Sequence, residues 1–445
     1  MVAGRGGEKR PLDGAQRRAV EAAARGREPV SLIHGPPGTG KTAVAVAVLA
    51  AWAAREEASK SASANPMKVH GGRVIRVPQL RKARKARPAP GADEYDDGLP
   101  QILCVSESHV AVDHLLAGLV AARVKAVRVG APVGDRGDRV PTRTADALGK
   151  HSLDVVARDA RKRSRAAGND AAAQTRAAWE AQRAALRKAR VVCATCVAAG
   201  QGFLKNLRFR DVLIDEAAHA TELGALVGVA RGCRRLVLVG DHRQLPPSVQ
   251  CRLAEREGLG RSLFERLAPR LEPVLLETQY RAPSALARFS SLRFYEARVR
   301  DGGRPESGAP AGLRWPRADL PVCFRPISGR ERREATSLAN AAEVLEVTKI
   351  VRGFVGDARN GLGAAGIGVV TPYAAQARAL TLALEDLRDV EVASVDAFQG
   401  REKPVIVVST VRCNTQGDVG FLADWRRTNV ALTRATRGVV VVGHA

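Results

Sequence analysis

The sequence predicts an α/β protein with two domains, each built on a parallel β-sheet. Short runs of Val, Ile and Leu alternate with helical stretches along the 445 residues, and such near-continuous apolar runs are typical of strands covered on both faces. A chain of this length is long enough for two or three domains with cores of their own. A glycine-rich turn between an early strand and a long helix also indicates an α/β fold.

The strands fall into two sets. The first comprises PVSLIHG, ILCVSES, VVCAT, VLIDEA and RLVLVGD, with helices expected over 41–55 and 109–122. The second follows LFERLAPRLEP and comprises PVLLETQ, AGIGVVTP, VEVASVD, PVIVVST and GVVVVGH. We therefore predict one domain at 1–267 and a second at 268–445.

Two segments interrupt the first set. Residues 56–98 contain RKARKAR, RPAPG and DEYDD, which favour a flexible surface insertion over a nuclear address. The second is a helical basic insertion at 134–190, in which residues 151–190 are rich in Ala and Arg. Asn169 with Asp170 is placed to cap a helix that runs to 190. We expect this helical basic insertion either to cover nucleic acid or to be a solvated helix.

The charge is strongly positive. The net charge is +25, and 13 of the 71 basic residues are Lys, so 71 − 13 = 58 are Arg. Such a balance suggests a polyanionic partner, although a GC-rich genome also enriches Arg, Ala and Gly.

The cysteines and the apolar runs indicate in which cellular compartment the protein is expected. Seven cysteines are an odd number spread over the chain, which predicts a reducing, intracellular location in cytoplasm, nucleus or both. The only CxxC pair, Cys193 and Cys196, has no second pair, so we expect no zinc site. The longest apolar run, at 43–54, is too short to cross a bilayer, and the N-terminus lacks the apolar core of a signal peptide.

A phosphate-binding loop is the strongest motif. GPPGTGKT matches the Walker A pattern between a strand and a helix, which is the context that this motif requires. Its glycines let backbone N–H groups turn toward phosphate oxygens, and the helix N-terminus adds its positive end. The residues predicted to bind the triphosphate are Gly35, Pro36, Pro37, Gly38, Thr39, Gly40, Lys41 and Thr42. Lys41 would neutralise the β and γ oxygens, and Thr42 would offer its hydroxyl to Mg²⁺.

Two carboxylates end the apolar strand of VLIDEAAHA. Asp215 and Glu216 follow three apolar residues, and buried carboxylates usually serve a cation or a reaction. A strand end that has reached water is the alternative. Beside a phosphate loop, Asp215 is placed to hold Mg²⁺ together with Thr42, and Glu216 to take a proton from the attacking water.

Further motifs follow in order along nearly the whole chain. They are LDGAQRRAV, ILCVSESHVAVDHLL, VVCATCVAAG, LVLVGDHRQLPPSV, LLETQYRAPSALARFSSLRFYEARV, IGVVTPYAAQARAL, and the stretch from VEVASVDAFQGREK to ALTRATRGVVVVG. With GPPGTGKT and VLIDEAAHATE, they resemble superfamily 1 helicases, closest to the up-frameshift (RNA-surveillance) branch. The resemblance implies two tandem RecA-like P-loop NTPase domains, with ATP hydrolysed in the cleft between them.

The resemblance also assigns roles to single residues. Gln16 would read the adenine edge, Tyr280 would stack on the base, and Glu402 would contact the ribose hydroxyls.

Three further residues would act at the γ-phosphate. Gln244 would orient the water or sense the phosphate, Arg281 would reach its oxygens, and Arg434 matches the arginine finger. Because the second domain has no phosphate loop, its two arginines make sense only if the nucleotide lies between the domains.

Nucleic-acid contacts are expected from loops that face away from ATP. By resemblance these are Ser106, Val110, Thr195, Pro246, Pro372, Tyr373 and Ser394. Hydroxyls and backbone N–H groups bind phosphate without reading sequence, and an aromatic or proline edge stacks on a base, although each residue could equally be ordinary turn chemistry. The implied partners are single-stranded RNA or DNA, with 5′→3′ movement, and proteins of RNA processing or surveillance, with the chain itself a monomer and no membrane involved.

The chain departs from the family pattern at several points. His219 replaces a common Gln, His109 a usual Asn, and Ser394 a usual Thr. The accessory β-barrel expected before Gln16 and the Cys/His-rich regulatory domain are missing, which fits a minimal core, a fragment or a truncated gene model. His219 and the missing barrel favour the alternative of a nucleic-acid clamp or scaffold that binds ATP but hydrolyses it poorly. The intact site residues favour an ATP-dependent helicase or translocase that unwinds RNA or DNA; they are Lys41, Asp215, Glu216, Gln244, Arg281 and Arg434. A metabolic kinase or GTPase is disfavoured, because the chain has no Asn-Lys-x-Asp motif.

Overall fold

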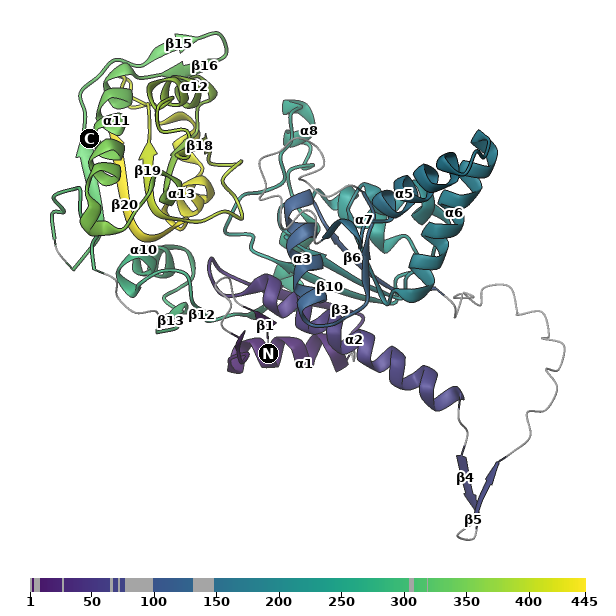
Figure 1. Cartoon of the computed structure of the whole chain (residues 1–445). Helices are drawn as coiled ribbons and strands as arrows, with labels where there is room; N and C mark the ends of the chain where they lie inside the picture. The colour runs from purple at the N-terminus through teal and green to yellow at the C-terminus, as the bar shows by residue number, and fades with distance from the viewer. Residues whose placement is uncertain are drawn as a thin grey trace. The chain divides into compact units, whose positions relative to one another are not determined.

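The structure is a computed structural model, and it describes residues 2–3, 9–25, 28–64, 67–70, 73–76, 99–130, 148–303, 308–317 and 319–445. The chain divides into two compact units (Figure 1). The first comprises Met1–Ile33, Lys41–Gly240 and Ser248–Val274, and the second comprises His34–Gly40, Asp241–Pro247 and Leu275–Ala445. Two short segments that we placed in the first domain, 34–40 and 241–247, therefore group with the second unit. The domain border at 267/268 stays a prediction.

The first unit contains a seven-stranded sheet in the order β11-β3-β10-β9-β6-β8-β7. Its strands are β3 (Val30–His34), β6 (Ile102–Ser106), β7 (Ala126–Arg128), β8 (Val191–Thr195), β9 (Asp211–Asp215), β10 (Arg235–Gly240) and β11 (Val274–Leu275). The pairs from β10 to β7 are parallel. In the register of β6, Ser106 lies opposite both Asp215 and Thr195, so three predicted site residues end their strands at one edge.

Helices and short strands complete this unit. They are β1 (Val2–Ala3), β2 (Lys9–Arg10), α1 (Gly14–Arg25), α2 (Lys41–Ala64), β4 (Met67–His70), β5 (Arg73–Arg76), α3 (His109–Ala121), α5 (Leu153–Ala166), α6 (Ala171–Lys188), α7 (Glu222–Val229), α8 (Arg252–Arg256) and α9 (Leu263–Leu271). The apolar run at the start of α2 is part of the core, since Val44, Val48 and Leu49 are fully buried. Burial of each such side chain is worth about 1.5–3 kcal/mol, and it anchors the helix behind the phosphate loop.

The two predicted insertions differ in outcome. α2 continues to Ala64, so residues 56–64 are helical rather than flexible, because the helix-favouring Ala, Glu and Lys continue past the buried run. β4 and β5 pair as an antiparallel hairpin, while RKARKAR lies outside the described residues.

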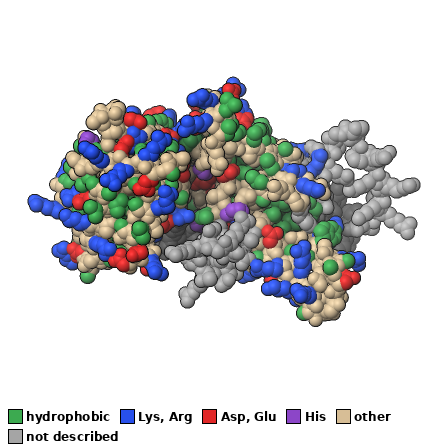
Figure 2. Space-filling model, turned by 90° about the horizontal axis from the view of Figure 1, so that it is seen from above, with side chains coloured by type: hydrophobic (Ala, Val, Ile, Leu, Met, Phe, Trp, Pro, Cys, Tyr) green, Lys and Arg blue, Asp and Glu red, His purple; other side chains and the backbone are tan. Residues whose placement is uncertain are grey.

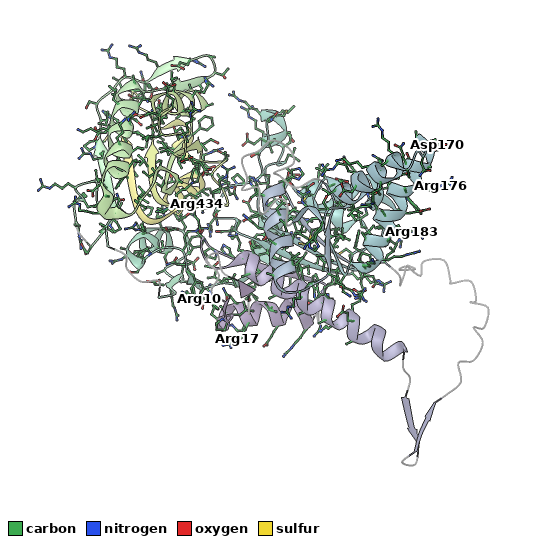
Figure 3. The ribbon with its side chains drawn as sticks, viewed as in Figure 1. Arg10, Arg17, Asp170, Arg176, Arg183 and Arg434 are labelled. Carbon is green, nitrogen blue, oxygen red and sulfur yellow. The ribbon has the colours of Figure 1, made fainter. Side chains whose placement is uncertain are left out.

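The Ala- and Arg-rich stretch forms α5 and α6, which lie side by side (Figure 1). Asp170 caps α6 as predicted, because its Oδ1 accepts a hydrogen bond from Ala173 N at 2.7 Å. Arg176 and Arg183 follow along this helix (Figure 3), and the Arg183 guanidinium lies 5.0 Å from the centre of the Trp179 ring. The start of this insertion, residues 134–147, lies outside the described residues.

The second unit contains a five-stranded parallel sheet in the order β14-β20-β19-β17-β18. Its elements are β12 (Thr278–Gln279), α10 (Ser284–Phe294), β13 (Arg300–Asp301), β14 (Val322–Pro326), β15 (Arg332–Glu334), β16 (Ser337–Ala339), α11 (Ala341–Gly356), β17 (Ile367–Thr371), α12 (Ala374–Ala383), β18 (Glu391–Ser394), β19 (Lys403–Ser409), α13 (Trp425–Leu432) and β20 (Ala435–Gly443). Along β19, Val405 and Val407 join one core cluster with α11 and α12. Ile406 and Val408 join another with α10 and α13. Both faces are therefore covered, and the predicted fold class of two parallel-sheet α/β units is confirmed.

One predicted strand was assigned to the wrong sheet. PVLLETQ was placed in the second set, but β11 lies beside β3 in the first sheet and β12 pairs with β13. The chain uses this segment to cover the open edge of β3, where Leu276 N donates to His34 O at 2.8 Å.

Lys and Arg side chains are scattered among acidic ones over the face in Figure 2 and form no single basic stripe there. In the described ranges, we find no helix with the length and apolar character that a membrane span requires.

Candidate active site

The phosphate loop is held in shape by its glycines. Gly38 has φ +75° and Gly40 has φ +82°, a left-handed backbone that costs glycine little. The Thr39 hydroxyl donates to Pro36 O at 2.7 Å and the Thr39 N–H donates to the same oxygen at 3.3 Å. A Cβ on Gly38 would lie 2.6 Å from the Cβ of Arg281, so only glycine fits against this arginine. Gly35 and Pro36 are buried, and Pro37 is half-buried.

The predicted metal ligands lie together in the first unit. Thr42 Oγ1, in the first turn of α2, is 3.5 Å from Asp215 Oδ2 at the end of β9. Asp215 is 1% exposed, and burial, followed by the charge of Glu216, raises its pKa to about 7 against the opposing effect of Lys41. A hydroxyl beside a carboxylate is the hard-oxygen donor set that Mg²⁺ prefers. A divalent cation at this position would also offset the desolvation of Asp215.

Glu216 is held in a strained backbone conformation. Its φ is +53°, which is uncommon for a residue with a side chain and costs of order 1 kcal/mol. The following turn is fixed by β10, because Ala217 N donates to Val239 O at 2.9 Å. A Cβ on Gly240 would lie 2.8 Å from Ala218 N, so the turn packs directly on this glycine. Glu216 is half-buried, and its backbone N–H donates to Asp215 Oδ1 at 3.0 Å, so the strained residue is tied directly to the carboxylate that ends β9.

Gln16 has a structural role that sequence reasoning missed. Gln16 N donates to Asp13 Oδ1 at 2.8 Å, and Asp13 N donates to Gln16 Oε1 at 3.1 Å. This reciprocal pair is a capping box at the N-terminus of α1. The spacing Asp-x-x-Gln in LDGAQ was the available signal. Gln16 is 6% exposed, so the predicted contact with adenine would use a side chain that is already buried.

Asp241 is the centre of a buried hydrogen-bond network in the second unit. It is 2% exposed, and its Oδ1 accepts from His34 Nε2 at 2.8 Å and from Arg243 N at 3.0 Å. Its Oδ2 accepts from Gln244 Nε2 at 2.6 Å and from Tyr295 OH at 2.7 Å. Gln244, the predicted γ-phosphate sensor, is thus held by Asp241. Asp241 is part of the motif GDHRQ, but we had predicted no role for it.

The two predicted arginines both lie in the second unit and are both held by hydrogen bonds. Arg434 is 2% exposed, and its guanidinium donates to Val430 O at 2.9 Å and to Gln244 Oε1 at 3.3 Å. Arg281 donates to Glu402 Oε2 at 2.9 Å and to Thr433 O at 3.0 Å. Glu402, predicted to contact the ribose, therefore forms an ion pair with Arg281 in this structure.

Tyr280 is fixed next to the phosphate loop. Its backbone N–H donates to Gly38 O at 2.9 Å. Its ring packs against Gly302, where a Cβ would overlap the ring and lie 2.7 Å from Gln279 O. Glycine at 302 therefore sets the position of the ring that we predicted to stack on adenine.

The predicted nucleic-acid residues differ in accessibility. Val110 is 36% exposed near the start of α3, Pro246, Pro372 and Ser394 are half-buried, and Thr195 is 8% exposed. Thr195 Oγ1 and Ser394 Oγ accept from the backbone N–H three residues further on, at 3.3 and 3.2 Å. Ser106 is fully buried and Tyr373 is 4% exposed, so these two side chains offer almost no surface to a strand.

Two of the departures from the family pattern occupy ordered positions. His219 lies on the turn after β9, where its backbone N–H donates to Glu216 O at 2.9 Å. His109 Nδ1 is 3.2 Å from Nη2 of the buried Arg128, whose Nε lies 2.6 Å from Asp113 Oδ1. His109 is thus tied to an internal ion pair at the start of α3.

The fold and the site together define a P-loop nucleoside triphosphatase with two parallel-sheet α/β units. Family models described as AAA domain match residues 11–178 and 152–252, and residues 259–445. The chain belongs to this AAA-domain family, and its motifs resemble those of up-frameshift-like superfamily 1 helicases.

Curated relatives cover almost the whole chain. The regulator of nonsense transcripts 1 homolog of Arabidopsis thaliana is 34% identical over 97% of this chain and 32% of its own length. The ATP-dependent helicase NAM7 of Saccharomyces cerevisiae is 36% identical over 94% of this chain and 40% of its own. The chain thus spans about a third of the length of these relatives. The solved structure of an arterivirus nonstructural protein 10 (helicase) aligns with 96% of this chain and 61% of its own at 13% identity, with a TM-score of 0.43.

Proposed function

We propose that this chain hydrolyses ATP with Mg²⁺ and uses the energy to move along single-stranded nucleic acid and unwind it. The observation that carries the proposal is the buried Asp215, 3.5 Å from the Thr42 hydroxyl and followed by a strained Glu216. Strain and buried charge of this kind are concentrated at functional sites. The curated relatives that are named ATP-dependent helicases support the same activity.

Each residue would contribute a separate step. Mg²⁺, held by Thr42 and Asp215, would neutralise charge on the phosphate oxygens. Lys41 would bind the β and γ oxygens, and Glu216 would accept the proton of the attacking water. Because Gln244 and Arg434 are hydrogen-bonded to each other, they would act together on the γ-phosphate, which stabilises charge as it develops.

The strand that is moved is proposed to be RNA, because the relatives are named for nonsense transcripts. Single-stranded DNA is kept in the test as the competing substrate. Movement in the 5′→3′ direction, action as a monomer and protein partners of RNA surveillance belong to the same proposal.

The runner-up is an ATP-binding clamp that grips nucleic acid with little hydrolysis. His219, on the turn that carries Glu216, is the observation that favours it, because a change on this turn can uncouple the strand from the phosphate site.

ATP hydrolysis with and without single-stranded RNA and DNA of one sequence tests the proposal. We expect at least a several-fold increase with RNA, and we expect Lys41→Ala and Glu216→Gln each to abolish it. Lys349→Ala and Glu385→Gln are matched exposed controls and should leave the rate unchanged. A Glu216→Gln variant with the wild-type rate would refute the base assignment. The clamp would be established by a wild-type chain that binds both ATP and the strand but does not hydrolyse ATP, whether or not the strand is present.

A further inference from the structure

The segment that follows β19 has an unusual conformation. Val411 has φ +71°, an outlier for a β-branched residue. Its N–H donates to Glu343 Oε2 at 2.9 Å, and its carbonyl accepts from Asn340 Nδ2 at 3.2 Å. Glu343 is fully buried and also accepts from the Ser409 hydroxyl at 2.6 Å. The start of this loop is therefore fixed by α11, and its strain is maintained by the surrounding bonds.

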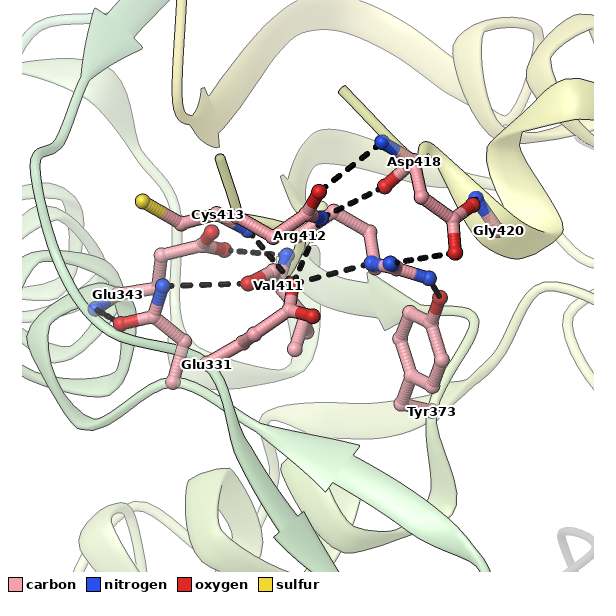
Figure 4. A network of polar contacts seen from close by, with 10 residues as sticks. Glu331, Glu343, Tyr373, Val411, Arg412, Cys413, Asp418 and Gly420 are labelled. Atoms are coloured by element: carbon pink, nitrogen blue, oxygen red, sulfur yellow. Dashed lines mark hydrogen bonds and ion pairs between the residues drawn. The ribbon is translucent and has the colours of Figure 1, made fainter. Parts of the chain in front are cut away.

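Arg412 fixes the rest of the loop (Figure 4). Its Nε donates to Glu331 Oε2 at 3.0 Å, its Nη2 lies 2.9 Å from Asp418 Oδ2, and its Nη1 is 3.5 Å from Tyr373 OH. Glu331 Oε2 also accepts from Cys413 N at 2.8 Å. One guanidinium thus connects the loop to Glu331, just before β15, and to Tyr373, the second residue after β17.

Gly420 brings the next residue close to Tyr373. Its φ is +53°, and a Cβ would overlap the Arg412 guanidinium and lie 2.5 Å from Tyr373 OH. Its N–H donates to Asp418 Oδ1 at 2.8 Å. The result is that Phe421 lies edge-on to Tyr373, with ring centres 5.4 Å apart, and remains 52% exposed.

A positive charge lies over the Phe421 ring. The guanidinium carbon of Arg427 is 5.3 Å from the ring centre. Arg427 is held in place by Asp424 Oδ2 at 3.3 Å and Asp396 Oδ1 at 3.6 Å. Asp396 follows Ser394 by two residues on the loop after β18, so the cation over Phe421 is anchored beside one predicted nucleic-acid position, while the ring itself contacts another, Tyr373.

Exposure separates the two aromatic residues. Tyr373, predicted to stack on a base, is 4% exposed, whereas Phe421 offers half of its surface. Only 4% of the chain is aromatic, and an exposed phenyl ring with an adjacent guanidinium is the combination that single-stranded nucleic acid uses for stacking and charge.

We propose that Phe421, with Arg427, is a base-stacking contact for single-stranded nucleic acid, and that Arg412 is the residue that positions it. This inference rests on the proposed function and specifies the aromatic surface that the strand meets. A protein segment docking on the same ring is the competing outcome.

The test is equilibrium binding of the full chain to fluorescein-labelled 12-nucleotide oligouridine, measured by anisotropy in the absence of ATP. We expect Phe421→Ala to weaken binding about 5- to 160-fold, which corresponds to about 1–3 kcal/mol for one stacked base. Phe421→Trp should restore it, because stacking needs an aromatic face and not one particular ring. Phe324→Ala is the matched control, since Phe324 is 47% exposed on β14, and it should bind as the wild type does.

Oligonucleotides that contain 2-aminopurine provide a second readout. Stacking on Phe421 should quench the fluorescence of the base, and Phe421→Ala should abolish that quenching. The Arg412→Gln variant should also weaken binding, and the double variant should bind no more weakly than Phe421→Ala alone.

The outcomes separate the two proposals. If the wild type binds and Phe421→Ala binds equally well, with unchanged quenching, the stacking contact is refuted while the proposed function stands. Additive losses in the double variant would refute the positioning role of Arg412. If the wild type binds neither oligouridine nor an oligothymidine of the same length, the proposed function itself fails.

Discussion

Replacement of Asp215 by Asn should stabilise the protein while it removes catalysis. Asp215 is 1% exposed, and its pKa is raised from 3.8 to about 7, first by burial and then by the charge of Glu216. The difference between these two pKa values corresponds to about 4 kcal/mol, at 1.36 kcal/mol per pH unit. Asparagine has nearly the same shape and no charge, so Asp215→Asn removes that penalty.

The sign of the pH dependence follows from proton binding. Between about pH 4 and pH 7, folded Asp215 retains a proton that the unfolded chain has released, so stability falls as pH rises through this window. The full penalty is present above pH 7. Asparagine has one acceptor oxygen in place of two, and loss of one hydrogen bond costs about 1 kcal/mol. The net expectation for Asp215→Asn is a gain of about 3 kcal/mol at pH 8 and a loss of about 1 kcal/mol below pH 4.

Urea unfolding followed by circular dichroism at pH 4 and pH 8 measures both effects, alongside the ATPase rate. Asp389→Asn, at an exposed position, controls for the change of residue type and should shift neither midpoint. The reasoning would be refuted by an Asp215→Asn variant that is no more stable than the wild type at pH 8. A gain that is equally large at pH 4 would refute the electrostatic cause. Mg²⁺ should flatten the pH dependence of the wild type and leave that of Asp215→Asn unchanged.

Two further predictions concern the second unit. Gly302→Ala should raise the KM for ATP several-fold with little change in kcat, because a Cβ at 302 would displace the Tyr280 ring; Gly363→Ala, which meets no atom within 4 Å, should leave steady-state kinetics unaltered. Burial, followed by the charge of His34, lowers the pKa of His242 from 6.5 to about 4, so the folded protein lacks a proton that the unfolded chain binds, and stability should fall as pH drops from 6.5 towards 4. His242→Gln should reduce that acid-dependent loss in urea titrations, and an identical pH profile would contradict the assignment.

The local features of the site could be predicted from the sequence, because neighbouring residues determine them. The phosphate loop between β3 and α2 depends on glycine geometry, and the Asp215–Glu216 pair depends on the end of strand β9; a short motif encodes both. The cap of α6 by Asp170 is equally local.

Features that depend on distant contacts could not be predicted. The burial of Tyr373 results from Arg412 and Gly420, which are 39 and 47 residues further along the chain. The link between Gln244 and Tyr295 runs through Asp241, and no local pattern indicates that these residues meet. The edge strand β11 pairs with β3 at the open edge of the first sheet. The order of the strands in the assembled sheet determines which edge is open, and no short motif encodes that order.

The capping box of α1 has a consequence for ligand recognition. A glutamine side chain on a surface loses about 1.5–2 kcal/mol of rotamer freedom when a ligand immobilises it. Gln16 has already lost that freedom during folding, because Asp13 holds its amide oxygen. A base edge that meets Gln16 therefore encounters a preorganised partner, and selectivity among nucleotides at this position would arise from a rigid amide and not from a side chain that adapts to each base.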